Sequence, residues 1–512
     1  MRREALTLAL TVLAGTATAG GPRFEEHAAR LGITHSYAGG WEFFVGGGVA
    51  VFDCSGDGRP EIYAAGGVGT AMLIRNRTAQ GGFDFAPDTP PELAMTGVTG
   101  AYPLDIDGDG ITDLAILRVG DNRLLRGLGA CRFAPLTGRA FSSGDRWTTA
   151  FSATWEDGAT LPTLAFGNYV DRADPAGPFR ACDVNMLYRP EGGRYGAPLP
   201  LAPGHCALSM LFSDWNRAGR ADLRVSNDRH YYVDEGAEQM WAMEATPRLY
   251  TRAEGWREHK LWGMGIASRD ITGDGLPEVM LTSMADQKLQ RRVPGSDGPA
   301  FETMPFDRGT TAQRPYTGGD GRPSTGWHAG FGDVDNDGRD DLFIAKGNVD
   351  QMPGLAMKDP NNLLMQGADG RFTEAGEAAG IASLARSRGA ALADLDRDGR
   401  LDLVVHNRRA PIAIYRNVTR GTGHWLSVTL DQPPPNRHGV GAFIELRTGA
   451  GTQSREITVG GGHAGGQRGP AHFGLGGADG AELRVIWPDG KAGPWREVDA
   501  NRHVTVTRRV PR

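Results

Sequence analysis

The residues best able to do chemistry in this chain are acidic side chains that recur in one short loop. The loop reads DIDGDGITDL, DVDNDGRDDL and DLDRDGRLDL in its fullest copies, and the copies begin at Asp53, Asp105, Asp214, Asp270, Asp333 and Asp394. In most copies, oxygen-bearing side chains stand at the first, third and fifth positions. A glycine stands at the sixth position, and a carboxylate stands at the ninth. Calcium prefers about six to eight oxygen ligands, and alternate side chains of a tight loop can converge on one ion. The pattern therefore predicts calcium-binding loops.

The twelfth position separates this loop from the EF-hand, which it otherwise resembles at its start. An EF-hand needs a glutamate there, but four copies have Ala64, Ile116, Ile344 and Val405. The last carboxylate has moved to the ninth position, next to an apolar run. Loop by loop, the predicted calcium ligands are Asp53, Ser55, Asp57 and Glu61; Asp105, Asp107, Asp109 and Asp113; Asp270, Thr272, Asp274 and Glu278; Asp333, Asp335, Asp337 and Asp341; and Asp394, Asp396, Asp398 and Asp402.

An ordinary Asp-Gly turn would explain a single copy, because aspartate often hydrogen-bonds nearby backbone amides. Repetition of the same spacing favours calcium instead. The Asp214 copy is a weaker candidate, because Ala218 occupies its fifth position. We expect a structural role for the calcium ions, since each loop crowds like charges that repel one another unless a cation neutralises them.

The spacing of the loops predicts a repeat fold. Each loop lies between two short apolar or small-residue runs, which are typical of strands. The intervals are mostly about 50 to 60 residues, and the doubled interval between 105 and 214 contains a degenerate copy, Trp155 to Leu164, which is expected to bind nothing. Seven units of this length predict an all-β protein built as a seven-bladed β-propeller. A linear solenoid is the alternative, but no polar end caps are obvious.

The pattern changes near residue 422. The runs that follow alternate like half-buried strands between Gly/Pro turns. We therefore predict a propeller over residues 20–422 and a small, sandwich-like all-β domain over residues 423–512. The polar stretch 284–326 is predicted to be an insertion at one end of the propeller.

The first residues are typical of an export signal. Arg2 and Arg3 precede an apolar run, and an A-x-A site ends at Ala19. This predicts a Sec signal peptide over residues 1–19, cleaved after Ala19, and a secreted or periplasmic protein. The apolar run is too short to span a bilayer comfortably, and no other stretch is suited to a transmembrane segment.

Four cysteines in an oxidising compartment indicate disulfides, with three possible connectivities. Cys182 and Cys206 flank a segment rich in Pro and Gly and are expected to pair first. For Cys54, a buried core position and a bond to Cys131 both remain open.

The acidic loops resemble the FG-GAP or VCBS repeat, the calcium-loop blade of integrin α-subunit propellers. The stretch NRHGVGAFIEL, from Asn436 to Leu446, together with HFGLG and VIWPDG, resembles the ASPIC/UnbV domain. A signal peptide followed by such repeats and then by this domain is similar to the arrangement in the bacterial relatives of cartilage acidic protein. The resemblance implies a secreted calcium-binding propeller in adhesion or matrix contact. The chain departs from the family in the lost calcium loop of its third unit and in the absence of a Ser-Gln pair from GGQRGPAHFGLG.

The residues just before the loops should lie near the propeller axis, and most are Gly or Ala. Trp327, His328 and Arg388 are exceptions, which predicts either a ligand site at the channel mouth or ordinary channel packing.

Two alternative functions are predicted. The first is a binding or adhesion module for carbohydrate or a surface protein. The second is an extracytoplasmic enzyme at the channel mouth, either polysaccharide-active or a metal-dependent oxidoreductase. A net charge of −6 and a pI near 6.1 argue against a nucleic-acid partner. The oligomeric state stays open.

Overall fold

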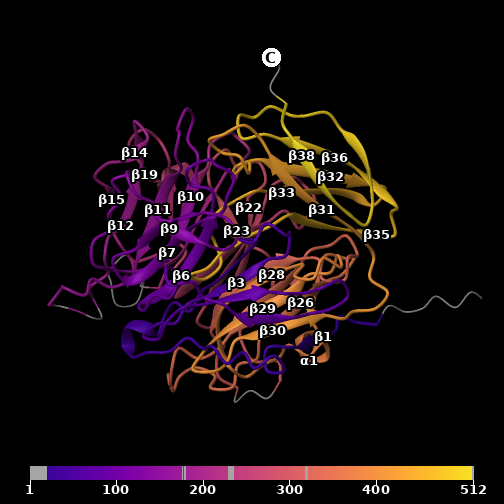
Figure 1. The fold of residues 1–512 in the computed structure, drawn as a ribbon, viewed down its shortest axis with the longest axis horizontal. Coiled ribbons are helices and arrows are strands. Elements are labelled where there is room, and N and C mark those ends of the chain that lie inside the picture. Colours follow the sequence, from indigo (N-terminus) through magenta and orange to yellow (C-terminus); the bar gives the residue numbers. More distant parts are fainter. Residues whose placement is uncertain (1–19, 176, 178–179, 229–235, 318–320, 510–512) are drawn as a thin grey trace, which may run out of the picture.

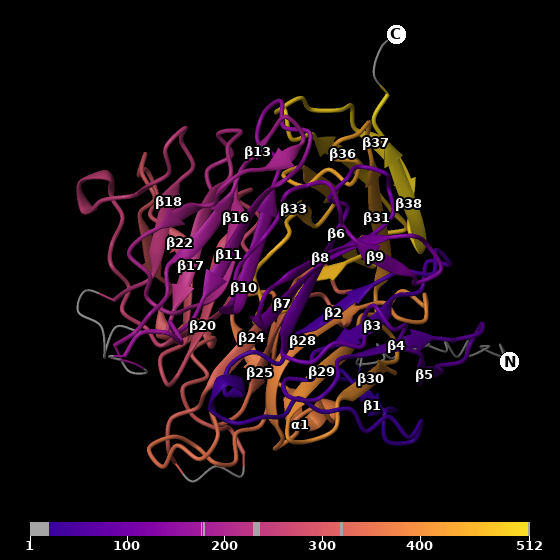
Figure 2. The same cartoon turned by 60° about the vertical axis from the view of Figure 1, so that its left-hand side comes forward.

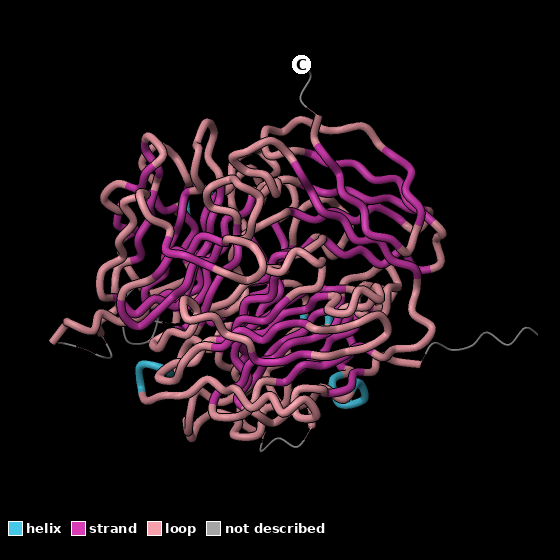
Figure 3. The backbone as a smooth tube through the Cα atoms, in the orientation of Figure 1, coloured by secondary structure: helices cyan, strands magenta, loops and turns pink. Residues whose placement is uncertain are grey.

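The computed structural model describes residues 20–175, 177, 180–228, 236–317 and 321–509, and the predicted signal peptide lies outside them. Strands dominate this part of the chain (Figure 3). Its helical elements are α1 (Gly376–Ala379) and the 3-10 turns η1 (Trp41–Phe43), η2 (Arg252–Glu254) and η3 (Phe306–Arg308). The predicted all-β class is confirmed. No helix of the described residues has the length and apolar character needed to cross a membrane.

Most strands pair in antiparallel groups of four that follow one another along the chain (Figure 1). The first three groups are β2 (Val49–Phe52), β3 (Glu61–Ala64), β4 (Met72–Asn76) and β5 (Phe85–Pro87); β6 (Val98–Leu104), β7 (Asp113–Gly120), β8 (Arg123–Gly127) and β9 (Phe133–Pro135); and β10 (Arg146–Thr154), β11 (Thr163–Asn168), β12 (Asn185–Tyr188) and β15 (Leu199–Leu201). β7 also pairs with β10, which joins the second and third groups. A hairpin, β13 (Pro190–Glu191) and β14 (Arg194–Tyr195), lies between β12 and β15.

The remaining groups repeat the same order. They are β16 (Ala207–Ser213), β17 (Asp222–Asn227), β18 (Gln239–Ala242) and β19 (Arg248–Leu249); β20 (Gly263–Arg269), β21 (Glu278–Ser283), β22 (Lys288–Arg292) and β23 (Phe301–Thr303); β24 (Gly326–Gly332), β25 (Asp341–Lys346), β26 (Asn362–Gln366) and β27 (Phe372–Glu374); and β28 (Arg386–Ala393), β29 (Asp402–Arg408) and β30 (Ala413–Asn417) with β1 (Phe24–Glu26). Each acidic loop connects the first and second strands of a group, and the degenerate copy does so between β10 and β11.

The groups close into a ring, because β1 from the start of the chain completes the last group. Phe24 of β1 lies opposite Asn417 of β30. A separate apolar cluster fills the space between each group and the next, and one that includes Val51, Ala391 and Val404 joins the last group to the first. β28 also contacts β2. A ring of four-stranded sheets without a long free edge is β-propeller-like.

Strand β25 shows why the second strands are continuous apolar runs. Leu342 and Ile344 pack toward the fifth group, and Phe343 and Ala345 pack toward the seventh. Successive side chains point to opposite faces of a strand. Both faces are buried between neighbouring sheets, so the central positions 342–345 are all apolar.

The stretch 284–326 is not an insertion, and that prediction is wrong. It contains β22 and β23, the two outer strands of the fifth group. Outer strands reach the solvent at the rim, so the sequence KLQRR of β22 can be polar and still form a strand.

After β30 the chain forms a second unit with two sheets. β31 (His424–Asp431) pairs with β35 (Ala471–Gly476) and β38 (Arg502–Thr507), and the other sheet contains β32 (Phe443–Thr448), β33 (Gly451–Glu456), β36 (Gly480–Ile486) and β37 (Arg496–Asp499). Apolar side chains of both sheets, such as Leu426 and Ile444, share one core. The unit lies at one end of the propeller in both views, drawn in yellow (Figures 1 and 2).

One segment of this second unit enters the propeller. Residues 457–470, here called the channel segment, connect β33 to β35 and include β34 (Gln467–Arg468), which pairs with β2. The channel segment forms hydrogen bonds with the first strand of every group, through Val51, Ala101, Ala153, Met210, Ile266, His328 and Leu392. It therefore fills the propeller axis.

The channel segment explains the small residues of the first strands. A Cβ atom added to Gly100 would lie 1.6 Å from the carbonyl oxygen of Ala464, and one added to Gly48 would lie 1.8 Å from the same atom. The glycines are needed because two backbones approach closely there.

The expected disulfide forms, and the open alternative at Cys54 is settled as a second one. Cys182 is bonded to Cys206, and Cys54 is bonded to Cys131. The second bond joins an acidic loop of the first group to the connection between β8 and β9.

Candidate functional site

The first aspartate of each acidic loop organises the backbone of the turn. Asp105 accepts hydrogen bonds from the amides of Gly108 and Gly110, both at 2.9 Å, and Asp333 accepts from Asp337 and Gly338 at 3.0 and 2.7 Å. The glycine at the sixth position has a positive φ, 90° at Gly110, which a side chain would disfavour. The loop is therefore shaped by its own first carboxylate.

The ninth carboxylate ties the loop to the sheet, because it begins the second strand of the group. Asp113 accepts hydrogen bonds from the amides of Ile106 and Gly127, both at 2.7 Å. Asp341 and Asp402 make the matching pairs of contacts in their loops. Each of these carboxylates is buried, so it lies beneath the turn and faces the other acids of the loop.

Carboxylate oxygens from the first, third and ninth positions converge in three loops. One oxygen from each member lies within 4.8 Å of the others in the sets Asp105, Asp107 and Asp113; Asp333, Asp335 and Asp341; and Asp394, Asp396 and Asp402. The Oδ1 atoms of Asp335 and Asp396 are buried and have no hydrogen-bond partner. Unpartnered buried oxygens beside other carboxylates are the donor set that calcium accepts. These three loops fit a calcium ion.

Burial and the neighbouring negative charges both raise the pKa of these acids. Burial is the main cause that raises the pKa of Asp113 to about 7 and that of Asp394 to about 7. It also raises the pKa of Asp333, Asp341 and Asp402, with a further contribution from the adjacent aspartates. A bound cation would remove this penalty by stabilising the charged form.

Arginines compensate part of the charge at each of the three loops. Arg126 forms ion pairs of 2.7 Å with both Asp107 and Asp109, and Arg416 forms one of 2.6 Å with Asp396. Arg339 pairs with Asp337 in the same way. Arg126 and Arg416 come from outer strands of their groups and Arg339 from the loop itself, and each pairs with a third or fifth acid.

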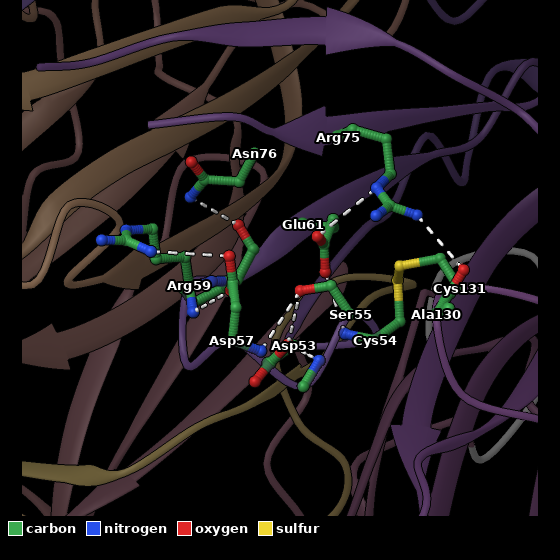
Figure 4. The surroundings of a disulfide bond; sticks show 12 residues. Asp53, Cys54, Ser55, Asp57, Arg59, Glu61, Arg75, Asn76, Ala130 and Cys131 are labelled. Carbon is green, nitrogen blue, oxygen red and sulfur yellow. Dashed lines mark hydrogen bonds and ion pairs between the residues drawn. A yellow bond between two sulfur atoms is a disulfide. The ribbon is translucent and has the colours of Figure 1, made fainter. Parts of the chain in front are cut away.

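The Asp53 and Asp270 loops are less complete, because Ser55 and Thr272 replace the third acid. Figure 4 shows Ser55 and Glu61 beside the disulfide of Cys54. The Oε1 atom of Glu61 is buried without a hydrogen bond, although Arg75 lies 3.6 Å away, and burial raises its pKa to about 7. The carboxylates of these two loops form no convergent set among the described residues.

In the Asp214 loop, the ninth acid accepts hydrogen bonds from protein donors. Asp222 accepts hydrogen bonds from Trp215 Nε1 at 3.0 Å, from the Tyr250 hydroxyl at 2.7 Å and from the amide of Met243 at 2.9 Å. This arrangement agrees with the expectation that the Asp214 loop is a weaker candidate for calcium binding.

Trp327, His328 and Arg388 lie together but not at an open channel mouth. Their exposed fractions are 0%, 9% and 0%. The guanidinium of Arg388 stacks on the Trp327 ring at 3.8 Å and donates to the carbonyl oxygens of Phe44 and Val349. His328 Nδ1 accepts a hydrogen bond from the amide of His463 in the channel segment. A ligand would have to displace protein to reach them, and their predicted ligand role stays a prediction.

The acidic loops face the C-terminal unit, which the sequence did not indicate. The amides of Gly423 and Gly476 donate to carbonyl oxygens of the Asp333 loop at 2.9 Å. In the Asp105 loop, His438 Nδ1 lies 3.6 Å from Asp105 Oδ2. The residues of each pair are far apart in the chain, Gly423 and Asp335 being the nearest, so no local pattern could have revealed them.

Comparisons with known proteins support the two-part organisation. The model for the FG-GAP-like repeat matches residues 53–116 and 333–405, and the model for ASPIC and UnbV matches residues 432–511. Cartilage acidic protein 1 is 34% identical over 113 residues in both Mus musculus and Homo sapiens, which is 21% of this chain. The match spans only 17% and 16% of those proteins.

Among solved structures, two lectins are similar. One, from Burkholderia pseudomallei, has a TM-score of 0.43 and 10% identity, with 74% of this chain and 98% of the lectin covered. The other, from Agrocybe aegerita, has a TM-score of 0.39 and 14% identity, with 73% and 94% covered. The chain thus contains FG-GAP-like repeats and a C-terminal ASPIC/UnbV domain.

Proposed function

We propose that this protein is a secreted or periplasmic binding module whose β-propeller is stabilised by calcium, and that it recognises carbohydrate or a surface protein. The observation that carries the calcium part is the convergence of three carboxylates, of which the one at the ninth position is buried, in each of three loops at the same positions. When bound, calcium would supply positive charge and fixed oxygen coordination at these loops. The FG-GAP-like repeats support a binding role.

The residues expected to hold calcium follow from the geometry. In the Asp105, Asp333 and Asp394 loops, the first, third and ninth carboxylates converge, and the fifth carboxylate stands at the rim of the turn. The Asp53 and Asp270 loops offer fewer carboxylates and would bind more weakly. Extracellular calcium modules bind at about 10⁻⁴ to 10⁻³ M, so tight sites are not required.

Location outside the cytoplasm is supported by the chemistry of the cysteines. All four are paired in disulfides. Disulfides persist in oxidising compartments and are rare in the cytosol. N-terminal sequencing of the exported protein would test this part, and a mature chain beginning at Gly20 is expected.

Calcium binding is tested by calorimetric titration of the calcium-free protein. We expect at least three sites, and one fewer in the variant Asp396→Ala. A stoichiometry of zero would contradict the proposal. A carbohydrate array probed with and without calcium then tests recognition, and binding that requires calcium without release of product would support a binding module.

A further inference from the structure

A large cavity lies between the acidic-loop end of the propeller and the C-terminal domain. Its volume is about 890 Å³. Asp53, Asp105 and Asp394, the first acids of three loops, line one side, and strand β31 lines the other. Ligand sites commonly measure about 300–1,000 Å³ and favour domain interfaces. The cavity is therefore of a size that suits a small ligand or a short oligomer.

The face of β31 toward the cavity is polar and aromatic. Leu426, Val428 and Leu430 belong to the core of the C-terminal domain. The alternate residues Trp425, Ser427 and Thr429 line the cavity, as expected for the opposite face of a strand, and the buried Val428 and Leu430 also border it. A face used only for docking would be expected to be apolar at its centre. Its composition points instead to a ligand with both polar groups and a surface on which an indole can stack.

Positive charge exceeds negative charge around the cavity. The lining arginines are Arg269, Arg397, Arg437, Arg455, Arg468 and Arg502, whereas the lining acids are the three loop aspartates and Glu456. Arg269 and Arg455 pair with Asp340, Arg437 pairs with Asp431, and Arg502 pairs with Asp499, acids that do not line the cavity. Calcium in the loops would neutralise the lining aspartates, so that Arg397 and Arg468 add positive charge to the cavity. The cavity would then attract a ligand that carries negative charge.

Two buried side chains in the wall retain unused hydrogen-bonding atoms. Arg455 is 5% exposed, and its Nε has no hydrogen-bond partner, although its Nη2 donates to Asp340 at 3.0 Å. His472 is also 5% exposed; its Nε2 lies 2.7 Å from the amide oxygen of Asn336, and its Nδ1 has no partner. With the proton on Nε2, Nδ1 is left as an acceptor. A guanidinium donor and an imidazole acceptor together suit a ligand that has both anionic groups and hydroxyl groups.

We propose that this cavity binds an acidic oligosaccharide, with its carboxylate or sulfate groups toward the arginines and a sugar face against Trp425. The proposal rests on the proposed calcium loops, because calcium sets the charge of the adjacent wall. Calcium and saccharide should strengthen the binding of each other, since coupling between two sites is reciprocal.

The test is calorimetry on the full-length mature protein with two acidic probes and one neutral probe. A hyaluronan hexasaccharide carries carboxylates, a heparin hexasaccharide carries sulfates as well, and maltohexaose is the neutral control. We expect at least one acidic probe to bind about tenfold or more tightly than maltohexaose, a difference of about 1.4 kcal/mol. The affinity should fall with added salt and fall again when EGTA removes calcium.

Matched variants test whether the saccharide binds in this cavity. The double variant Arg397→Gln/Arg437→Gln removes two cavity arginines that are at least partly exposed, and we expect it to lower the affinity about tenfold or more. The control variant Arg291→Gln/Arg371→Gln removes two exposed arginines that lie outside the cavity and pair with acids. It should bind like the wild type. Equal loss in both variants would overturn the assignment to the cavity.

The remaining outcomes separate this inference from the proposed function. Calcium binding without binding of either acidic probe overturns the saccharide site and leaves the calcium module intact. Absence of calcium binding overturns the proposed function itself. Equal binding of maltohexaose, or binding of hexaglutamate in place of both saccharides, would show that the ligand class is wrong.

Discussion

The Asp214 and Asp394 loops have the same position in their blades but treat their ninth carboxylate differently. Asp222, in the Asp214 loop, receives an indole N–H, a phenol O–H and a backbone amide. Asp402, in the Asp394 loop, receives only backbone amides and lies with Asp394 and Asp396 in one cluster of oxygens. The ninth carboxylate of the Asp214 loop is compensated by protein donors, whereas in our proposal that of the Asp394 loop is compensated by a calcium ion.

The comparison teaches how a repeat can lose its ion without losing its fold. A buried carboxylate costs free energy unless donors or a cation compensate it. Trp215 stands where the other full copies have an aliphatic residue, and Tyr250 reaches the loop from the end of the same blade. The donors from Trp215 and Tyr250 thus take the place that calcium has, in our proposal, in the other loops.

The largest expected effect comes from removing calcium altogether. Each site adds about 2.7 kcal/mol when calcium is a hundredfold above its Kd, so three sites should add several kilocalories per mole. Thermal unfolding followed by circular dichroism with calcium and with EGTA measures the difference. Magnesium at the same concentration is the control, and an unchanged melting temperature in EGTA would contradict calcium stabilisation.

The next effect is a dependence of this stabilisation on pH. Burial raises the pKa of Asp113 and Asp394 to about 7, above the unfolded value near 3.9. Without calcium, the folded state holds these protons more tightly than the unfolded state does, so stability is greatest below about pH 4 and is lost as the pH rises through about 7.

Calcium binds the deprotonated carboxylates and so reverses this trend. The calcium-induced increase in melting temperature should be small near pH 5 and complete near pH 8. The measurement uses protein depleted of calcium on a chelating resin, since EGTA itself loses affinity in acid. An increase of equal size at both pH values would show that these acids are not the ligands.

A smaller effect distinguishes the two loops directly. Asp402→Asn should remove one calcium site and reduce the calcium-dependent part of the stability. Asp222→Asn should lower the free energy of unfolding by about 1–3 kcal/mol, the cost of breaking a buried hydrogen-bonded group, and the loss should be the same with and without calcium. A calcium-dependent loss in the Asp222 variant would erase the contrast between the loops.

Local patterns predicted the loops well, because each loop is built from residues within nine positions of one another. The first, third and ninth acids of the three strongest copies converge. The pair Cys182–Cys206 was expected from the segment that these cysteines flank, whereas the partner of Cys54 was left open. The strands were visible for the same reason, since a strand buried on both faces is an apolar run.

Long-range contacts were not predictable in this way. The channel segment is rich in glycine and resembles a linker, yet its amides and carbonyls bind all seven first strands. A signal was present in the glycines of those strands, since runs such as Gly46 to Gly48 indicate a close backbone neighbour. The outer strands β22 and β23 were missed because rim positions are polar and carry no apolar pattern.

The smallest expected effect is that of restoring the missing acid in the Asp214 loop. Ala218 is exposed, so Ala218→Asp should change stability by less than about 0.5 kcal/mol. It should add no calcium site, because Asp222 still receives the donors of Trp215 and Tyr250. The triple variant Ala218→Asp/Trp215→Ile/Tyr250→Phe removes both donors and should gain one site by calorimetric titration. If the single variant already binds an additional ion, then hydrogen bonding to Asp222 does not prevent calcium binding in this loop, and its missing fifth acid is the cause.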